Sequence, residues 1–263
     1  MHDFIVDSHC HLDLIEEKGI TLSEILANCQ NSQVSILQTI CTKLEDIDKL
    51  LNYCQANSQI YCSIGIHPCN VSNQQQVEAN YLVNLSKTNS KIIGIGETGL
   101  DFFHDLKFID LQKSIFLEHI RASRITQLPS IIHSRNADEQ MAEILIAQQK
   151  IGYFPALLHC FSSSYQLAKI AIDLGIYISI SGIATFKNAH ELREIIKKIP
   201  LEFLLVETDS PYLAPDPFRG QVNQPSNTRL VAQLIADVKG LDLTKVIDQT
   251  TQNFLKIFTR VKI

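Results

Sequence analysis

The chain has 263 residues, 45% of them hydrophobic and 19% charged, a composition that excludes a disordered chain and can form a sizeable core. Its formal net charge is −5 and it contains no Lys- or Arg-rich run, which excludes a protein that binds a long stretch of duplex through a basic face. A nucleic acid would be held at an end or by a few phosphates, with bound metal cations supplying the positive charge.

The seven cysteines are odd in number and include no C-x-x-C motif, which indicates reduced thiols in a cytosolic protein. No apolar run approaches the ~20 residues that a membrane span needs. The first apolar run, at 4–6, is short and lacks the basic flank of a signal peptide. We therefore expect a cytoplasmic protein without membrane contact. Since no coiled-coil heptad or sticky edge is evident, we expect a monomer with no stable protein partner.

Short apolar runs, rich in β-branched residues, alternate with longer segments along the chain. Several runs are apolar at successive positions, as are parallel strands that are buried on both faces. We predict eight strands, at 4–11, 34–40, 60–67, 91–98, 129–134, 156–161, 176–182 and 203–208.

The segments between these runs have the periodicity of amphipathic helices. Ser162–Ser164 is typical of a capping cluster at the start of a helix, and Gly175 of a helix end. The stretch 210–226 holds four prolines and predicts a stiff loop after the eighth strand, which in a barrel lies over the active face. Two helices, around 227–239 and 242–259, are predicted to follow it.

Alternating strands and helices predict a parallel sheet with right-handed crossovers. Eight such units, in a chain near the ~250 residues of a typical α/β barrel, predict a single (β/α)8 TIM-type barrel domain over residues 1–263. A doubly wound open sheet is the alternative, but it usually has a Gly-rich first turn, whereas the first turn here is rich in histidine. No Pro/Gly/Ser-rich linker or charge run divides the chain.

Residues that can bind metal ions gather at the carboxyl ends of the predicted strands. His9 and His11 are two apart on the first strand, so both would point into the barrel mouth. The other candidates end the fourth, fifth and sixth strands or follow the eighth: Glu97, His133, His159 and Asp209. These ends converge on one rim of a barrel. Exposed or hydrogen-bonded side chains remain the alternative for the two N-terminal histidines alone, but not for the whole set.

The residue types indicate a metal centre that acts on an anionic substrate. Imidazole and carboxylate together bind divalent transition ions, and a carboxylate such as Glu97 can span two ions. Two ions ~3.5–4 Å apart can activate water and stabilise the leaving oxygen of a phosphoester. Two dications with Glu97 and Asp209 leave a net positive charge, which favours an anionic substrate.

Other polar residues lie near the same rim, and each has a plainer alternative. Glu207 shares strand parity with Asp209 and would act directly or orient a ligand histidine. Arg135 suits a phosphate oxygen, with a surface salt bridge as its alternative. His67 would bond a phosphate or only end the third strand, and Asp101 would orient a ligand or form a turn.

The neighbours of these residues are expected to play smaller parts. Asp7 points the same way as His9 and is expected to lie behind the ligands. Cys10 and Cys160 adjoin candidate histidines, but neighbours of inward strand residues point outward, so neither is expected to bind metal. The remaining histidines are expected to be solvated or helical and without function: His2, His104, His119 and His190.

Six ordered motifs resemble those of the TatD-type metal-dependent DNases. They are DSHCHLD (7–13), GIHP (65–68), GETGLD (96–101), IHSR (132–135), HCF (159–161) and ETDSPYLAP (207–215). They extend over most of the chain, and six motifs in order are highly specific. The resemblance implies an amidohydrolase-like barrel and a metal-dependent deoxyribonuclease that acts on DNA ends or single strands, as a 3′–5′ exonuclease.

The resemblance also implies roles for individual residues. It assigns His9, His11 and Asp209 to one ion, His133 and His159 to the other, and Glu97 to both. Asp209 would also accept the proton of the attacking water. Groups that contact the substrate or support the ligands would be His67, Arg135 and Glu207.

One departure and several alternatives stay open. The family often has Asn-Glu-Pro after the eighth strand, whereas this chain has Gln224 in the second position, so its loop is less acidic. The two divalent ions could be Mg²⁺, Mn²⁺ or Zn²⁺: four histidines favour a transition metal, while family members are often described as magnesium-dependent. Two other functions fit: a metal-dependent ester or amide hydrolase, such as an aminoacyl-tRNA deacylase, and a metal-binding protein without turnover.

Overall fold

The computed structural model describes residues 2–73, 77–104 and 106–262. Its strands are β1 (Ile5–Cys10), β2 (Val34–Thr39), β3 (Ile60–Ile64), β4 (Ile92–Asp101), β5 (Ser130–Arg135), β6 (Ala156–Leu158), β7 (Tyr177–Ile180) and β8 (Leu204–Val206). Its helices are α1 (Leu12–Glu17), α2 (Leu22–Asn31), α3 (Ile47–Ala56), α4 (Ala79–Thr88), α5 (Ile109–Thr126), α6 (Asp138–Ile151), α7 (Tyr165–Asp173), α8 (His190–Lys198), α9 (Thr228–Lys239) and α10 (Leu243–Ile257).

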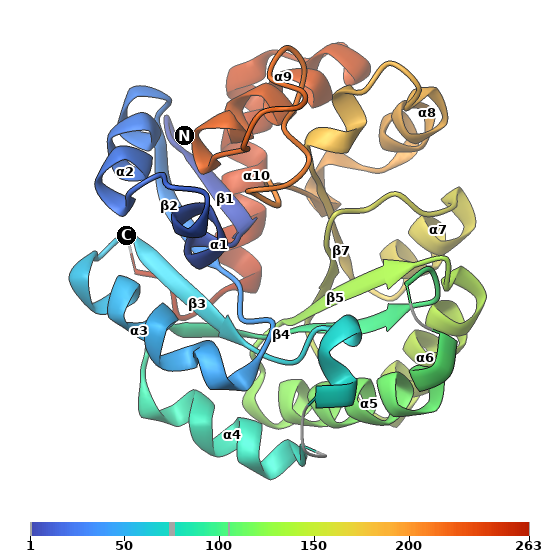
Figure 1. Ribbon diagram of the computed structural model, residues 1–263. Coiled ribbons are helices and arrows are strands. Elements are labelled where there is room, and N and C mark those ends of the chain that lie inside the picture. Colours follow the sequence, from blue (N-terminus) through green and yellow to red (C-terminus); the bar gives the residue numbers. More distant parts are fainter. Residues whose placement is uncertain (1, 74–76, 105, 263) are drawn as a thin grey trace.

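The eight strands form one parallel sheet in chain order, with the helices arranged around its outside (Figure 1). The sheet closes where the chain beyond β8 meets β1: Cys10 and Ser210 form a parallel bridge. Beside it, the backbone N–H of Asp209 donates to the carbonyl of His9 at 2.9 Å, and that of His11 to Ser210 at 2.8 Å. The predicted (β/α)8 TIM-type barrel is therefore confirmed, and the sequential strand order excludes the doubly wound alternative.

An apolar layer lies at the amino-terminal end of the barrel. Each strand contributes one buried residue to it, among them Ile131 of β5 and Leu157 of β6. Phe254 of α10 and Phe258, which follows this helix, pack against them. Two positions further along β5, and two beyond Leu157, the residues are His133 and His159. Alternate strand residues share a face, so His133 and His159 point into the barrel like the apolar residues before them. The barrel interior therefore changes from apolar to polar toward the carboxyl ends of the strands.

Strand β4 is longer than the predicted 91–98. It pairs with β5 through Asp101, which lies opposite Arg135. Glu97 therefore lies inside the strand, at a register shift between Gly96 and Thr98, and does not end it. Asp101 therefore closes the strand, where the sheet fixes its backbone, and its side chain accepts the backbone N–H groups of the turn that follows.

Four other strands end two or three residues earlier than predicted, namely β3, β6, β7 and β8. The loops that continue β3, β6 and β8 carry His67, His159 and Asp209. The two predicted C-terminal helices are confirmed as α9 and α10, and Ser164 caps α7 by accepting a hydrogen bond from the N–H of Leu167. Among the described residues, no helix is both long enough and apolar enough to cross a membrane.

Candidate metal centre

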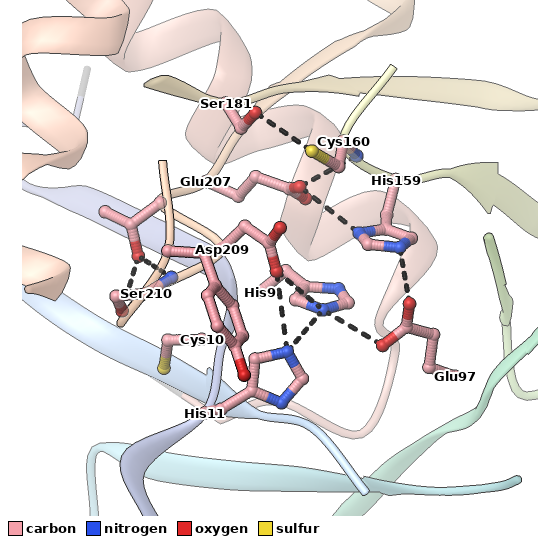
Figure 2. A network of polar contacts seen from close by, with 12 residues as sticks. His9, Cys10, His11, Glu97, His159, Cys160, Ser181, Glu207, Asp209 and Ser210 are labelled. Carbon is pink, nitrogen blue, oxygen red and sulfur yellow. Dashed lines mark hydrogen bonds and ion pairs between the residues drawn. The ribbon is translucent and has the colours of Figure 1, made fainter. Parts of the chain in front are cut away.

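Three side chains meet at the seam between β1 and β8. The Nε2 atoms of His9 and His11 are 3.3 Å apart, and Asp209 Oδ1 lies 3.6 Å from the first and 3.4 Å from the second. Figure 2 shows the two rings and the carboxylate converging on one point. Asp209 has a left-handed backbone (φ 55°), which bends the chain sharply beyond β8 beside the two rings.

Glu97 joins this group to a second one. Its Oε2 lies 3.4 Å from His9 Nε2, whereas its Oε1 lies 2.7 Å from His159 Nε2 and 3.1 Å from His133 Nδ1. The carboxylate is buried, and its two oxygens face different sets of imidazoles (Figure 2 shows His9 and His159 on either side).

His67 belongs to the second group. It follows β3, and its Nε2 lies 3.3 Å from Glu97 Oε1. Its Nδ1 accepts the backbone N–H of Cys69 at 3.1 Å, so a neutral ring carries its proton on Nε2. The structure thus brings His67 against Glu97 as a hydrogen-bond donor, rather than leaving it as a residue that only ends a strand.

Two further carboxylates orient the histidines of the second group. Asp101 Oδ2 lies 3.1 Å from His133 Nε2, and Glu207 Oε1 lies 3.3 Å from His159 Nδ1. A carboxylate can only accept, so the ring proton lies on its side. The opposite nitrogens, His133 Nδ1 and His159 Nε2, face Glu97 and would offer their lone pairs to a bound ion, as metal-binding histidines typically do.

The cysteines beside the histidines differ from each other. Cys10 points away from the centre, as predicted, and its thiol donates to the carbonyl of Gln38. Cys160 does not point outward: β6 has already ended, the residue has φ 44°, and it lines the cleft with Sγ 3.1 Å from Ser181 Oγ. Strand alternation therefore could not orient Cys160. Its backbone N–H donates to Glu207 at 2.8 Å and helps to fix that carboxylate.

Asp7 lies behind the centre, as expected, but it contacts backbone rather than a ring. Its Oδ1 accepts the N–H of His9 at 3.3 Å and that of Thr208 at 2.9 Å, and its Oδ2 accepts the Thr208 hydroxyl at 2.6 Å. Burial raises the pKa of Asp7 to about 8, against the lowering effect of Thr208. Asp7 thus ties β1 to the chain after β8.

The charges inside the centre are strongly coupled. Burial raises the pKa of Glu97, but the positive charges of His159 and His67 outweigh it and hold this pKa well below its usual range. Burial lowers the pKa of His159, but Glu97 and Glu207 raise it well above the usual value. For His9, burial and the neighbouring His159 lower the pKa. Glu97 is therefore an anion held among imidazoles.

These residues fit divalent cations. Three groups, each with ligand atoms within 4.8 Å of one another, overlap at His9 and Glu97: His9–His11–Asp209, His9–Glu97–His159 and His67–Glu97–His133. Facing imidazole nitrogens and carboxylate oxygens are the donor set that transition ions prefer. The Nδ1 atoms of His9 and His11 have no hydrogen-bond partner among the described residues, so either ring can carry its proton there and offer Nε2 to an ion.

The comparisons with known proteins agree with this geometry. The family described as TatD related DNase matches residues 6–259. The chain belongs to this family. It is 37% identical to an uncharacterized metal-dependent hydrolase of Buchnera aphidicola, over 97% of the chain and 96% of the relative. It is 35% identical to the uncharacterized metal-dependent hydrolase YcfH of Escherichia coli, with the same coverage.

Among solved structures, the crystal structure of YJJV, a TatD homologue from Escherichia coli K12, superposes with a TM-score of 0.87 at 25% identity. The match covers 97% of this chain and 98% of that one. The chain is thus a TatD-family member, from a family of metal-dependent hydrolases, and its barrel is that of the solved homologue.

The centre lies at the bottom of a cleft of ≈ 1530 Å³. Arg135 lines this cleft, with its guanidinium carbon 4.3 Å from the centre of the Phe103 ring. Tyr212, on the loop after β8, is 53% exposed and also faces the cleft. Gln224, where the TatD family often has Glu, instead accepts a hydrogen bond from Asn28 of α2 at 2.7 Å and is not among the described cleft residues.

Two histidines expected to have no function have defined contacts. His104 lines the cleft, and its Nδ1 lies 2.8 Å from Asp101 Oδ2, one hydrogen bond away from His133. His119 of α5 is fully buried, where its Nε2 accepts the N–H of Ile66 at 3.2 Å. His104 lies in the turn after β4, where no strand or helix periodicity predicts the direction of a side chain.

Proposed function

We propose that this TatD-family protein hydrolyses phosphodiester bonds of DNA with two divalent ions, and that it removes nucleotides from the 3′ end of single strands. One ion would be held by His9, His11 and Asp209, the other by His133 and His159, and Glu97 would contact both. The observation that carries the proposal is the position of Glu97, whose two oxygens face the two sets of ligands separately.

Bound divalent ions would supply a nucleophilic hydroxide near neutral pH and neutralise charge that develops on the phosphoryl oxygens. Asp209 is placed to accept the proton of the attacking water. Burial raises its pKa, but the hydrogen bond from His11 and the charge of His9 outweigh burial and lower that pKa. Asp209 is therefore an anion at neutral pH, as a general base must be.

Two donors are available to the phosphate. His67 directs an Nε2 proton toward the centre, because its Nδ1 is occupied by the N–H of Cys69. Arg135 is exposed at the cleft wall and can offer a bidentate pair of N–H groups. Asp101 and Glu207 act one step further out, since they fix the tautomers of His133 and His159.

The cleft supports a polymeric substrate. Its volume of ≈ 1530 Å³ exceeds the roughly 300–1,000 Å³ of pockets that enclose small molecules. Its walls carry both signs of charge, with Lys43 and Lys49 near Asp46 and Glu17. Because the walls lack a basic surface, the positive charge for a phosphate must come from the ions, which favours an end over a long duplex.

The test follows a 5′-labelled single-stranded oligonucleotide with added Mg²⁺, Mn²⁺ or Zn²⁺. The wild type is expected to shorten it stepwise. Asp209→Asn is expected to be slower by ~10²–10⁴-fold, the usual contribution of a positioned general base. An oligonucleotide with a blocked 3′ end should be resistant, whereas one with a blocked 5′ end should not.

Metal content and thermal unfolding of Asp209→Asn serve as controls, because the variant must remain folded and metal-loaded to be informative. Equal rates for the wild type and this variant would remove Asp209 from the mechanism. If protein that holds two ions leaves every oligonucleotide intact but cleaves an aminoacyl ester, phosphodiester hydrolysis is the wrong reaction.

A further inference from the structure

A separate group of potential ligands lies beside the proposed two-ion centre. Cys69 lies in the short 3-10 helix η2 (Pro68–Asn73) after β3, Asp101 closes β4, and His104 follows three residues later. Since β3 and β4 are neighbours in the barrel, their carboxyl ends bring the three side chains together. The thiol, one carboxylate oxygen and one ring nitrogen all lie within 4.8 Å of one another.

The carboxylate of this group is rigidly held. Asp101 is fully buried, and its Oδ1 accepts the backbone N–H groups of Phe103 and His104, each at 2.9 Å. Its own N–H donates to Gln112 Oε1 at 2.9 Å. The other oxygen, Oδ2, is therefore fixed in position and faces both the centre and the loop that carries Cys69.

This oxygen has more donors than it can serve. His104 Nδ1 lies 2.8 Å from Asp101 Oδ2, His133 Nε2 lies 3.1 Å from it, and the Cys69 thiol donates to it at 3.7 Å. A carboxylate oxygen offers about two lone-pair sites. A cation between Cys69 and His104 would replace two of these donors and leave the bond to His133 intact.

We propose that Cys69 Sγ, Asp101 Oδ2 and His104 Nδ1 form a third cation site, selective for Zn²⁺ or another thiophilic divalent ion, with water as the fourth ligand. One thiolate, one imidazole and one carboxylate suit a tetrahedral zinc ion and suit Mg²⁺ poorly. Binding releases the Cys69 thiol proton to solvent. The His104 ring proton moves to Nε2, so the ring stays neutral.

The site would act on the neighbouring centre through one oxygen. An ion on Asp101 Oδ2 would be one hydrogen bond away from His133, and Cys69 also holds His67 through its backbone N–H. The third ion would therefore adjoin two histidines of the two-ion centre, His133 through Asp101 and His67 through Cys69.

The test is a Co²⁺ titration of the reduced full-length protein, followed by the near-ultraviolet charge-transfer absorption that a thiolate–cobalt bond produces and by elemental analysis of the bound metal. The wild type is expected to bind three ions, with the absorption developing with one of them. Cys69→Ser is expected to bind two ions and show no such absorption. His104→Ala should weaken that ion by at least ~10-fold, since even the loss of an outer partner has this effect.

Cys160→Ser is the matched control, because Cys160 is a free thiol that lines the cleft beside the two-ion centre but lies outside the proposed site. This variant is expected to leave the absorption unchanged. Absorption that persists in Cys69→Ser and disappears in Cys160→Ser would overturn the assignment. So would a wild type that saturates at two ions without any thiolate absorption.

Discussion

The two sides of the metal centre are built differently. On the β1–β8 side, the Nδ1 atoms of His9 and His11 have no hydrogen-bond partner among the described residues. On the β5–β6 side, His133 and His159 each direct their outer nitrogen at a buried carboxylate. The first side relies on the charge of Asp209, which contacts both of its rings.

This difference determines how the metal affinity of each side would respond to mutation. An outer carboxylate fixes the tautomer of a histidine and makes it a stronger ligand. We therefore expect the β5–β6 side to hold its ion more tightly and to depend on residues that do not themselves touch metal. The β1–β8 side should depend mainly on its own ligands.

Glu97→Gln should have the largest effect, because it removes a negative charge that faces the ligands of both sides. A neutral amide cannot balance His159 and His67, which hold the pKa of Glu97 far below its usual range. We expect the metal bound at this centre to fall from two ions to one or none, and activity to fall by orders of magnitude. Elemental analysis after dialysis checks this, with Asp46→Asn, a cleft carboxylate that contacts no ring among the described residues, as control. Two retained ions would show that the sides are independent.

Gly99→Ala should disturb the β5–β6 side by displacing the backbone of His133. Gly99 has φ +139°, and a Cβ there would lie 2.1 Å from the carbonyl oxygen of His133. The strained backbone of a non-glycine residue costs about 1–3 kcal/mol, and moving β4 away from β5 to relieve the clash costs more. We therefore expect the free energy of unfolding to fall by about 3 kcal/mol or more. Urea unfolding measures it. Gly220→Ala, with φ +88° and no atom within 4 Å of the added Cβ, should lose only about 1–2 kcal/mol.

The sequence predicted the barrel and the rim positions well, because hydrophobic runs and strand parity are local properties. Strand ends were less predictable, since they depend on pairing with a neighbour. Strand β4 extends to Asp101 only because β5 pairs with it as far as Arg135. The residues proposed as ligands still meet, because loops that continue the strands keep His159 and Asp209 on the same rim.

Side-chain direction beyond the strand ends could not be predicted. Cys160 turns into the cleft because of its left-handed backbone, which no pattern indicates. His104 contacts Asp101 within the turn that follows β4, whereas the contact of Cys69 with the same oxygen depends on how the chain after β3 packs against β4. Neither residue stands at a strand position, so periodicity carried no information about them.

Asp101→Asn and Glu207→Gln should separate the two sides most sharply. Each removes one carboxylate behind His133 or His159, and each should weaken the β5–β6 ion by ~10–100-fold while the other ion stays bound. Isothermal titration with Zn²⁺ in a Cys69→Ser background, which lacks the proposed third site, resolves the two affinities. Asp7→Asn is the control on the opposite side, because Asp7 contacts backbone and no ring. If Glu207→Gln lowers the affinity for both ions equally, the two sides of the centre do not bind metal separately.

His119→Gln should have a smaller effect, which concerns the stability of the fold. His119 accepts the N–H of Ile66, and Ile66 precedes His67, whose ring contacts Glu97. Burial lowers the pKa of His119 from 6.5 to about 4, so the neutral ring stabilises the fold fully above pH 6.5, and this contribution is lost as pH falls toward 4. At ~1.4 kcal/mol per pH unit, the penalty of His119→Gln should shrink by about 2 kcal/mol between pH 7 and pH 5. Urea unfolding of both proteins at the two pH values measures it. A penalty that stays constant would mean that the ring titrates equally in the folded and unfolded chains, and that the bond to Ile66 does not depend on the neutral ring.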